Sequence, residues 1–221
     1  MGRDRRNFSR ISGTRDPSLI VLATEGTETE PQYFEGVKEK CVERSSRIHI
    51  EILKRDSQSS SPKHVLEELK KHHSKMGLNS RDELCLVIDR DKQSWDEAQI
   101  SEVATLCGQK QYLLALSNPC FEVWLLLHLK CPTEYSEEKL AELFANQKRP
   151  KEQHSPLKKE IRSILGSFNP SNLNIDDFWH GVEEAIERAK RLDIAPRDRW
   201  QNTIGTRVYV FMEKILNSIR D

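Results

Sequence analysis

The sequence predicts an α/β fold with a mainly parallel sheet of about four strands, flanked by helices and followed by a helical C-terminal part. Short apolar runs, rich in leucine and β-branched residues, recur before residue 120. Segments with helical character separate these runs, and no further strand pattern follows them. Strands that alternate with helices are typical of βαβ crossovers, which build parallel sheets.

The first two predicted strands follow different patterns. Residues 19–23 form a continuous apolar run, which indicates a strand covered on both faces. A helix is expected from Glu30-Pro31, because proline suits the first turn of a helix. The second strand is expected at 47–53, where isoleucines alternate with polar side chains, and a serine-rich loop then leads to a helix over 62–76.

The third predicted strand, at 84–88, runs into the acidic segment Asp89-Arg90-Asp91. A helix over 95–107 precedes the fourth strand at 112–116, which ends in Ser117-Asn118-Pro119. The remaining apolar periodicity predicts a buried helix at 120–130 and further helices over 136–146, 156–166, 176–192 and 207–219.

The chain divides into three predicted parts. Residues 1–17 form a basic, flexible arm with five arginines and two aspartates. Residues 18–130 hold the α/β core, and residues 131–221 form a helical region that we expect to pack on the core. The length suits one α/β core with a smaller appendage.

Charge and cysteine usage exclude several classes of protein. The 35 lysine and arginine residues balance 35 acidic residues, which excludes a uniformly cationic nucleic-acid coat and leaves only local basic patches. The five cysteines are widely spaced and lack a CxxC pair, which indicates buried free thiols in a reducing cytoplasm and not a structural zinc site. No apolar run approaches the roughly 18–20 residues of a membrane helix, so we expect a soluble cytoplasmic protein.

Acidic residues follow two of the predicted strands. In an open parallel sheet, ligands gather beyond the carboxyl ends of the strands, where Glu25, Asp89 and Asp91 are expected. Aspartates at i and i+2 of an extended segment point to the same side, and together with the Glu25 carboxylate such hard oxygen ligands suit Mg²⁺. The alternative is structural: Glu25 is then a loop residue or helix cap, and the aspartates belong to a turn in which Ser94 or Asp96 caps the next helix.

Glu122 is a fourth acid of interest, because nearly all its neighbours in CFEVWLLLHL are apolar. Burying it unpaired would cost several kcal/mol. One interpretation places it in the first turn of a helix that Asn118 caps and Pro119 opens, where negative charge is favoured. The other places it in the same cleft as the other acids, either on the metal or on a metal-bound water.

Three basic segments are candidates for contact with a polyanion. One is the arginine-rich arm, and the others supply Lys70, Lys71, Lys148, Arg149, Lys151, Lys158 and Lys159. A solvated surface is the ordinary interpretation of such segments. The alternative, a rim that binds phosphate, predicts that binding depends strongly on salt.

Three motifs in order resemble the RloB family of bacterial defence-associated proteins, whose core is similar to the Toprim fold. They are EGTETEPQYF at 25–34, VIDRDKQSWDEA at 87–98 and SNPCFEVWLLLH at 117–128. The segment NTIGTRVYVFMEKI at 202–215 is similar to the closing helix of the family, but departs from its usual Asn-Pro-x-Thr-x-Val pattern.

The resemblance implies a Toprim-type metal site and an anti-phage, abortive-infection role. Glu25 would be the general acid/base, and Asp89 and Asp91 would hold Mg²⁺ or Mn²⁺. The implied activity is hydrolysis of phosphodiester bonds in RNA, such as tRNA, or in DNA, beside an ATPase partner encoded nearby.

Two other functions compete with the nuclease interpretation. A phospho-receiver would need an acidic pair after the first strand and a lysine after a late strand, where this chain has one glutamate and Ser-Asn-Pro. A non-catalytic Toprim-like module that works with an ATPase partner stays open. The number of metal ions, the oligomeric state and the trigger are not determined by the sequence.

Overall fold

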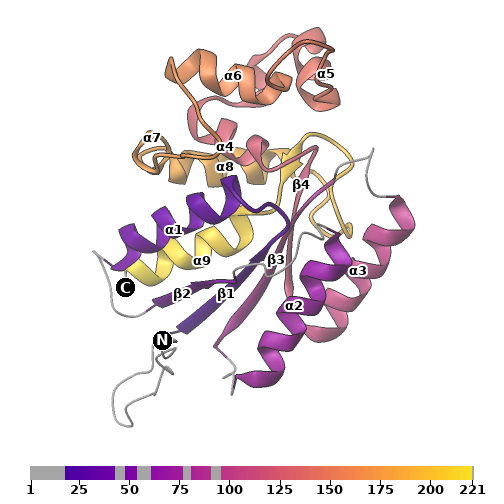
Figure 1. Ribbon diagram of the computed structural model, residues 1–221, viewed down its shortest axis with the longest axis vertical. Coiled ribbons are helices and arrows are strands. Elements are labelled where there is room, and N and C mark those ends of the chain that lie inside the picture. The colour runs from indigo at the N-terminus through magenta and orange to yellow at the C-terminus, as the bar shows by residue number, and fades with distance from the viewer. Residues whose placement is uncertain (1–17, 43–47, 54–60, 77–80, 91–95, 221) are drawn as a thin grey trace.

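A computed structural model of the chain describes residues 18–42, 48–53, 61–76, 81–90 and 96–220 (Figure 1). The predicted arm at 1–17, together with Asp91 and Ser94, lies outside the described residues.

The first part of the chain alternates strands and helices, as the apolar pattern predicts. Its elements are β1 (Ser18–Thr24), α1 (Thr29–Val42), β2 (Ile48–Ile52), α2 (Pro62–Lys75), β3 (Glu83–Asp89), α3 (Glu97–Lys110) and β4 (Leu113–Asn118). Asp96 caps α3 through a capping box with Gln99, which agrees with the predicted capping role of Asp96.

The second part is mostly helical. Its elements are α4 (Glu122–Leu129), a short 3₁₀ turn (Pro132–Glu134), α5 (Glu137–Ala145), α6 (Pro156–Leu165), α7 (Asp176–Trp179), α8 (Val182–Leu192), β5 (Gly205–Thr206) and α9 (Tyr209–Arg220).

In the described residues the strands form a five-stranded sheet in the order β2-β1-β3-β4-β5. The first four strands are parallel, and β5 is antiparallel to β4. This confirms an α/β fold with a mostly parallel sheet. Because the chain moves from β1 to β2 on one side and then returns to place β3 on the other, β1 and β3 flank a topological switch point. The carboxyl ends of two such strands diverge into a crevice that commonly binds ligands.

Helices cover both faces of the sheet. Figure 1 shows α1 and α9 on one face and α2 and α3 on the other, with α4 to α8 gathered beyond one end of the strands. Within β1, Ile20 and Leu22 join the hydrophobic cluster on the α1 face, whereas Leu19 and Val21 join the cluster on the α2 face. Burial on both faces explains why this strand is a continuous apolar run.

The residues after 130 pack against the α/β core. The Phe34 and Phe211 rings lie 5.5 Å apart, and residues before and after 130 share one hydrophobic cluster. A domain division at residue 130 remains a prediction.

Three local predictions were wrong. The strand β5 was missed, because two residues are too short to show an alternating pattern. Asn118 does not cap α4; it is the last residue of β4, and its Nδ2 donates to the carbonyl of Gln201 (2.8 Å), so α4 begins only at Glu122. The predicted helix at 176–192 is broken near Gly181, where a Cβ would collide with the carbonyl oxygen of His128.

The cysteines are free, and four of them are buried, as predicted: Cys41, Cys85, Cys107 and Cys131. Cys120 is partly exposed. Among the described residues, none of the helices has the length and apolar character needed to span a membrane.

Candidate functional site

The turn after β1 is folded around the carboxylate of Glu30, in the first turn of α1. The hydroxyl of Thr24 donates to the carbonyl of Gly26 (2.9 Å), and the Gly26 N–H donates to Oε1 of Glu30 (3.1 Å). A Cβ on residue 26 would collide with this carboxylate, so only glycine allows the approach.

Glu25 connects the carboxyl ends of β1 and β3. Its own N–H donates to the carbonyl of Val87 (2.9 Å), and its Oε2 accepts a hydrogen bond from the N–H of Asp89 (3.0 Å). The sequence placed Glu25 and Asp89 at one edge of the sheet, and the structure brings them into contact. Asp91, the third member of the predicted group, lies outside the described residues.

The carboxylate of Asp89 is the most constrained acid of the group. Its Oδ1 atom is buried and has no hydrogen-bond partner. Burial raises the pKa of Asp89 well above its usual value, and the nearby carboxylates of Glu30, Glu122 and Glu25 raise it further. A buried oxygen without a partner is costly, so an ion, a proton or a water would stabilise it.

Glu30 also holds its proton more tightly than an ordinary glutamate. Burial raises its pKa to about 7, with further increases from Glu122 and Glu25, while backbone hydrogen bonds oppose the shift. Four carboxylates therefore act on one another at this edge, and they cannot all be ionised without a compensating cation.

Glu122 is the first residue of α4 and is buried, with an exposed fraction of 7%. Its Oε1 lies 3.2 Å from the Nζ of Lys158 on α6. Burial alone would lower the pKa of Lys158, but the charge of Glu122 raises it above its ordinary value, so the lysine stays protonated. Both predicted roles of Glu122 are therefore compatible, since it lies at a helix N-terminus and also faces the other acids.

Glu30, Asp89, Glu122 and Lys158 line a cavity of about 370 Å³ at the switch point. Its walls come from the turn at 26–30, from Asp89, from residues 120–122 and from Asn146, Ser155 and Lys158 of the α5–α6 segment. Cys120 contributes its sulfur, which accepts a hydrogen bond from Nδ2 of Asn146 (3.2 Å).

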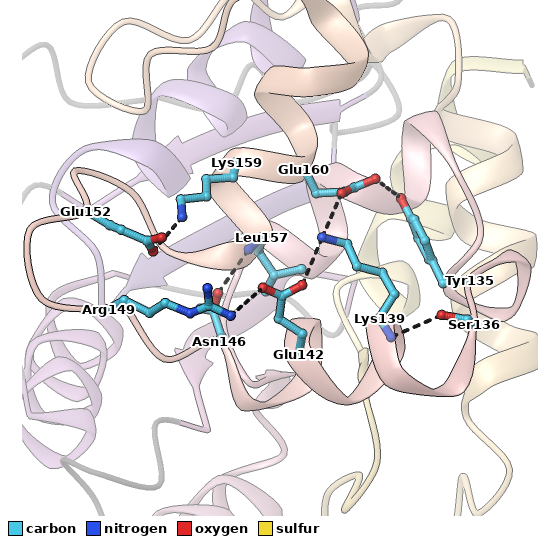
Figure 2. A network of polar contacts seen from close by, with 10 residues as sticks. All are labelled: Tyr135, Ser136, Lys139, Glu142, Asn146, Arg149, Glu152, Leu157, Lys159 and Glu160. Carbon is cyan, nitrogen blue, oxygen red and sulfur yellow. Dashed lines mark hydrogen bonds and ion pairs between the residues drawn. The ribbon is translucent and has the colours of Figure 1, made fainter.

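A polar network within the α5–α6 segment joins its two helices (Figure 2). Lys139 bridges Glu142 (3.1 Å) and Glu160 (3.2 Å), which ties α5 to α6. Oδ1 of Asn146 accepts from the N–H of Leu157 (3.1 Å), which joins the end of α5 to the start of α6. Each exposed ion pair is worth little alone, but several in one network fix the position of the loop that carries the lining residues.

A protein-family model matches most of the chain, including the elements that form this cavity. A family model described as RloB-like protein matches residues 20–215, from β1 into α9. The chain belongs to the RloB-like protein family. No curated protein and no solved structure matches it. The resemblance drawn from the three motifs is thus confirmed for the family, and the match extends through the weakly similar segment at 202–215.

The basic residues of this RloB-like chain fall into two groups. Lys70 and Lys71 pair with Glu67 (2.8 Å) and Glu68 (2.7 Å). These lysines lie in the half of α2 that leads toward the amino end of β3, so the structure does not bring them to the acids of the cavity. The other predicted cations belong to the α5–α6 segment near the cavity. Of these, Lys158 reaches the acids, Arg149 and Lys159 pair with Glu142 and Glu152, and Lys148 and Lys151 are exposed.

In the described part of the RloB-like chain, no three His, Cys, Asp or Glu side chains are arranged to hold a metal ion. The carboxylates instead bond to backbone N–H groups and to Lys158. The donor chemistry still fits a hard divalent cation: the groups are carboxylates, they repel one another, and Oδ1 of Asp89 is buried without a partner.

Sequence reasoning missed Glu30. Its position in the first turn of a helix looks like an ordinary favourable charge at a helix N-terminus. The available signal was the spacing of Glu25, Gly26 and Glu30, because a glycine between two acids lets the chain fold back on the second one.

The substitution Gly26→Ala is expected to displace the Glu30 carboxylate and to remove its bond to the backbone. Because the colliding atoms belong to the end of a side chain, we expect a small loss of stability, about 1 kcal/mol, and a larger loss of any activity at the site. Thermal unfolding and metal titration of the variant measure both effects. Gly108→Ala is the matched control, since a Cβ at Gly108 meets open space; equal effects of the two substitutions would contradict the assignment.

In the metal-free RloB-like protein, the contribution of Glu30 to stability is expected to fall as the pH rises from about 4.5 to 7. The folded state retains the Glu30 proton in this window and the unfolded state does not, so the contribution is present below pH 4.5 and is lost by pH 7. The limit is about 3 kcal/mol, set by the difference between the ordinary pKa of 4.5 and the folded-state pKa of about 7. Burial lowers the pKa of His128 to about 3, and this acts in the opposite direction below pH 6.5.

The measurement is therefore a difference between wild type and Glu30→Gln. Urea unfolding in EDTA at pH 5 and pH 7.5 should show the wild type losing stability relative to the variant. An unchanged difference between the two pH values would mean that Glu30 titrates normally.

Proposed function

We propose that this RloB-like protein is a metal-dependent nuclease with a Toprim-like site, acting as an anti-phage effector. The observation that carries the proposal is the gathering of Glu25, Glu30, Asp89 and Glu122 at the switch point between β1 and β3, with a buried oxygen of Asp89 left unpartnered. Phosphodiester hydrolysis requires such hard oxygen ligands, a proton carrier and a cation for the phosphate. The defence role rests on the family.

The proposed roles of the acids fall into two kinds, metal binding and proton transfer. Asp89, with Glu30, Glu122 and Asp91, would hold Mg²⁺ or Mn²⁺. When bound, the ion would polarise the phosphate and make a water nucleophilic at neutral pH. Glu25 would take or return the proton of the reacting oxygen, and its bond to the Asp89 N–H keeps its carboxylate oriented toward the metal ligand.

Lys158 supplies the positive charge that a phosphate needs. In the structure it neutralises Glu122 at the wall of the cavity. A cation bound by Glu122 would free the ammonium to contact a phosphoryl oxygen. Lys148 and Lys151 are exposed on the adjacent loop, where they would bind flanking phosphates of RNA or DNA.

The test is cleavage by the purified chain, alone and with the proposed ATPase partner. A panel of tRNA, other RNA, single-stranded DNA and duplex DNA is incubated with Mg²⁺, with Mn²⁺ or with EDTA. Sequencing RNA and DNA ends from cells that express wild type or Asp89→Asn then identifies the substrate. If neither protein sample cuts any member of the panel and the cells show no new ends, the nuclease proposal is wrong.

A second candidate function is a non-catalytic module that regulates an ATPase partner. The observation that favours it is the absence, among the described residues, of a formed three-ligand metal group, together with the Lys158–Glu122 ion pair. Calorimetry with Mn²⁺ separates the two functions: a nuclease site binds the ion and loses it in Asp89→Asn, whereas a scaffold gives no binding in either protein.

A further inference from the structure

One buried hydrogen bond joins the two helices that carry Glu30 and Glu122. The hydroxyl of Tyr33, on α1, lies 3.0 Å from Nε2 of His128, on α4. Nδ1 of His128 lies 2.8 Å from the carbonyl oxygen of Trp124, which can only accept, so Nδ1 carries the proton. Nε2 is then the acceptor and the Tyr33 hydroxyl is the donor. Both side chains are buried, and burial keeps the imidazole neutral by lowering its pKa.

Aromatic rings surround this hydrogen bond, and the side chain of Trp124 also interacts with the Tyr33 hydroxyl. Phe121 and Trp124 meet the Tyr33 ring edge-on, with centroids 5.7 and 6.4 Å away, and Phe178 meets His128 at 5.8 Å. Apolar contacts are not directional and permit small sliding movements, whereas a hydrogen bond fixes both distance and orientation. The Tyr33–His128 bond therefore sets the register of α1 on α4.

The other side of α4 is also fixed. The close approach of Gly181 to the His128 carbonyl leaves no room for a Cβ, and Nη1 of Arg188 donates to the carbonyl of Leu127 (2.6 Å). The end of α4 is thus anchored on α8, and Tyr33 links α1 to this anchored helix.

The acids oppose this arrangement. Glu30 lies three residues before Tyr33, on the same side of α1, and Glu122 begins α4. Both carboxylates line the same cavity, so their negative charges repel each other, and this repulsion pushes the two helix ends apart. The Tyr33–His128 link lies about one turn from Glu30 and nearly two turns from Glu122, and it resists the separation.

We propose that the Tyr33–His128 hydrogen bond sets the separation of the Glu30 and Glu122 carboxylates, which makes Tyr33 a positioning residue of the acidic site. The claim about separation stands on the geometry alone; its consequence for metal binding rests on the proposed function.

The separation is tested by a double-mutant cycle in EDTA. Unfolding free energies of Glu30→Gln, Glu122→Gln and the double variant give the coupling between the two carboxylates, first in the wild-type background and then with Tyr33→Phe. We expect the coupling to fall by at least half when the hydroxyl is removed. An unchanged coupling in Tyr33→Phe overturns the proposal, whether or not the protein is a nuclease.

The chain provides a matched control. Tyr112 donates to or accepts from Nδ1 of His73 (2.6 Å) and belongs to the cluster on the opposite face of the sheet. Tyr112→Phe also removes one hydroxyl from a Tyr–His pair, and it should leave the Glu30–Glu122 coupling intact. A similar fall in coupling for both substitutions would show a general loosening of the fold and would count against positioning.

Metal affinity gives the functional readout. Calorimetry with Mn²⁺ should show binding at least 5-fold weaker in Tyr33→Phe and unchanged in Tyr112→Phe. The double variant Tyr33→Phe/His128→Leu leaves no unpaired imidazole nitrogen, so its stability should recover relative to Tyr33→Phe, whereas its Mn²⁺ affinity should stay low. Recovery of both quantities would assign the pair a purely structural role. Failure of the wild type to bind Mn²⁺ would contradict the proposed function, and the double-mutant cycle would still decide the role of Tyr33.

Discussion

Asp89→Asn is expected to reduce the proposed nuclease activity by at least about 10³-fold and, in the absence of metal, to make the fold more stable by about 1–2 kcal/mol. Activity falls because an amide is a poor metal ligand. Stability rises because the substitution removes a buried charge that Glu25, Glu30 and Glu122 repel. Opposite changes in activity and stability are typical of a site whose residues lower the stability of the fold but are needed for activity. Cleavage assays and urea unfolding in EDTA measure the two quantities.

Asp82→Asn is the matched control. Oδ1 of Asp82 accepts from the N–H of Leu19 (3.0 Å), at the amino ends of the strands and away from the cavity. The same chemical change there should leave activity within about 2-fold and should not increase stability. A destabilised Asp89→Asn protein, or one that keeps a tenth of its activity, would show that Asp89 has a structural role only.

Lys158→Met is expected to give the second large effect, a loss of activity of about 10²-fold. The substitution keeps the length of the side chain but removes the ammonium, so Glu122 is left buried without its partner. Because Lys158 is about one-third exposed, water screens part of this pair, and we expect the metal-free protein to lose only about 1 kcal/mol. Mn²⁺ should restore this loss by taking over the compensation of Glu122.

Lys159→Met controls for the Lys158 substitution on the same helix. Lys159 pairs with Glu152 outside the cavity (2.5 Å), so its replacement should change activity by less than about 3-fold. Equal losses in both variants would point to a general electrostatic effect of α6 on nucleic-acid binding, with no special role for Lys158.

The strand ends explain why part of the site was predictable. An apolar run that is buried on both faces marks the extent of a strand. The sequence therefore shows which residue lies directly after the carboxyl end of that strand. Parallel pairing then brings the carboxyl ends of β1 and β3 together, and Glu25 contacts the backbone of Asp89.

The rest depends on contacts between segments that are distant in the sequence. Lys158 reaches Glu122 only because α6 packs on α4, and no local pattern encodes that contact. The sequence over 176–192 looks like one continuous helix. The helix is interrupted near Gly181, because the backbone of α4 approaches this residue closely. The residue type of Asn118 predicted a helix cap, but its side chain donates a hydrogen bond to the carbonyl of Gln201, 83 residues later in the chain.

The placement of Lys158 has a consequence for the synthesis of this protein. The acids lie in the part of the chain that leaves the ribosome first, and their positive partner follows only with α6. A nascent or prematurely terminated chain that stops near residue 130 would carry the carboxylates without the ammonium and without the loop that roofs them. Such a fragment is expected to have no nuclease activity, so the proposed activity would arise only once translation has passed α6.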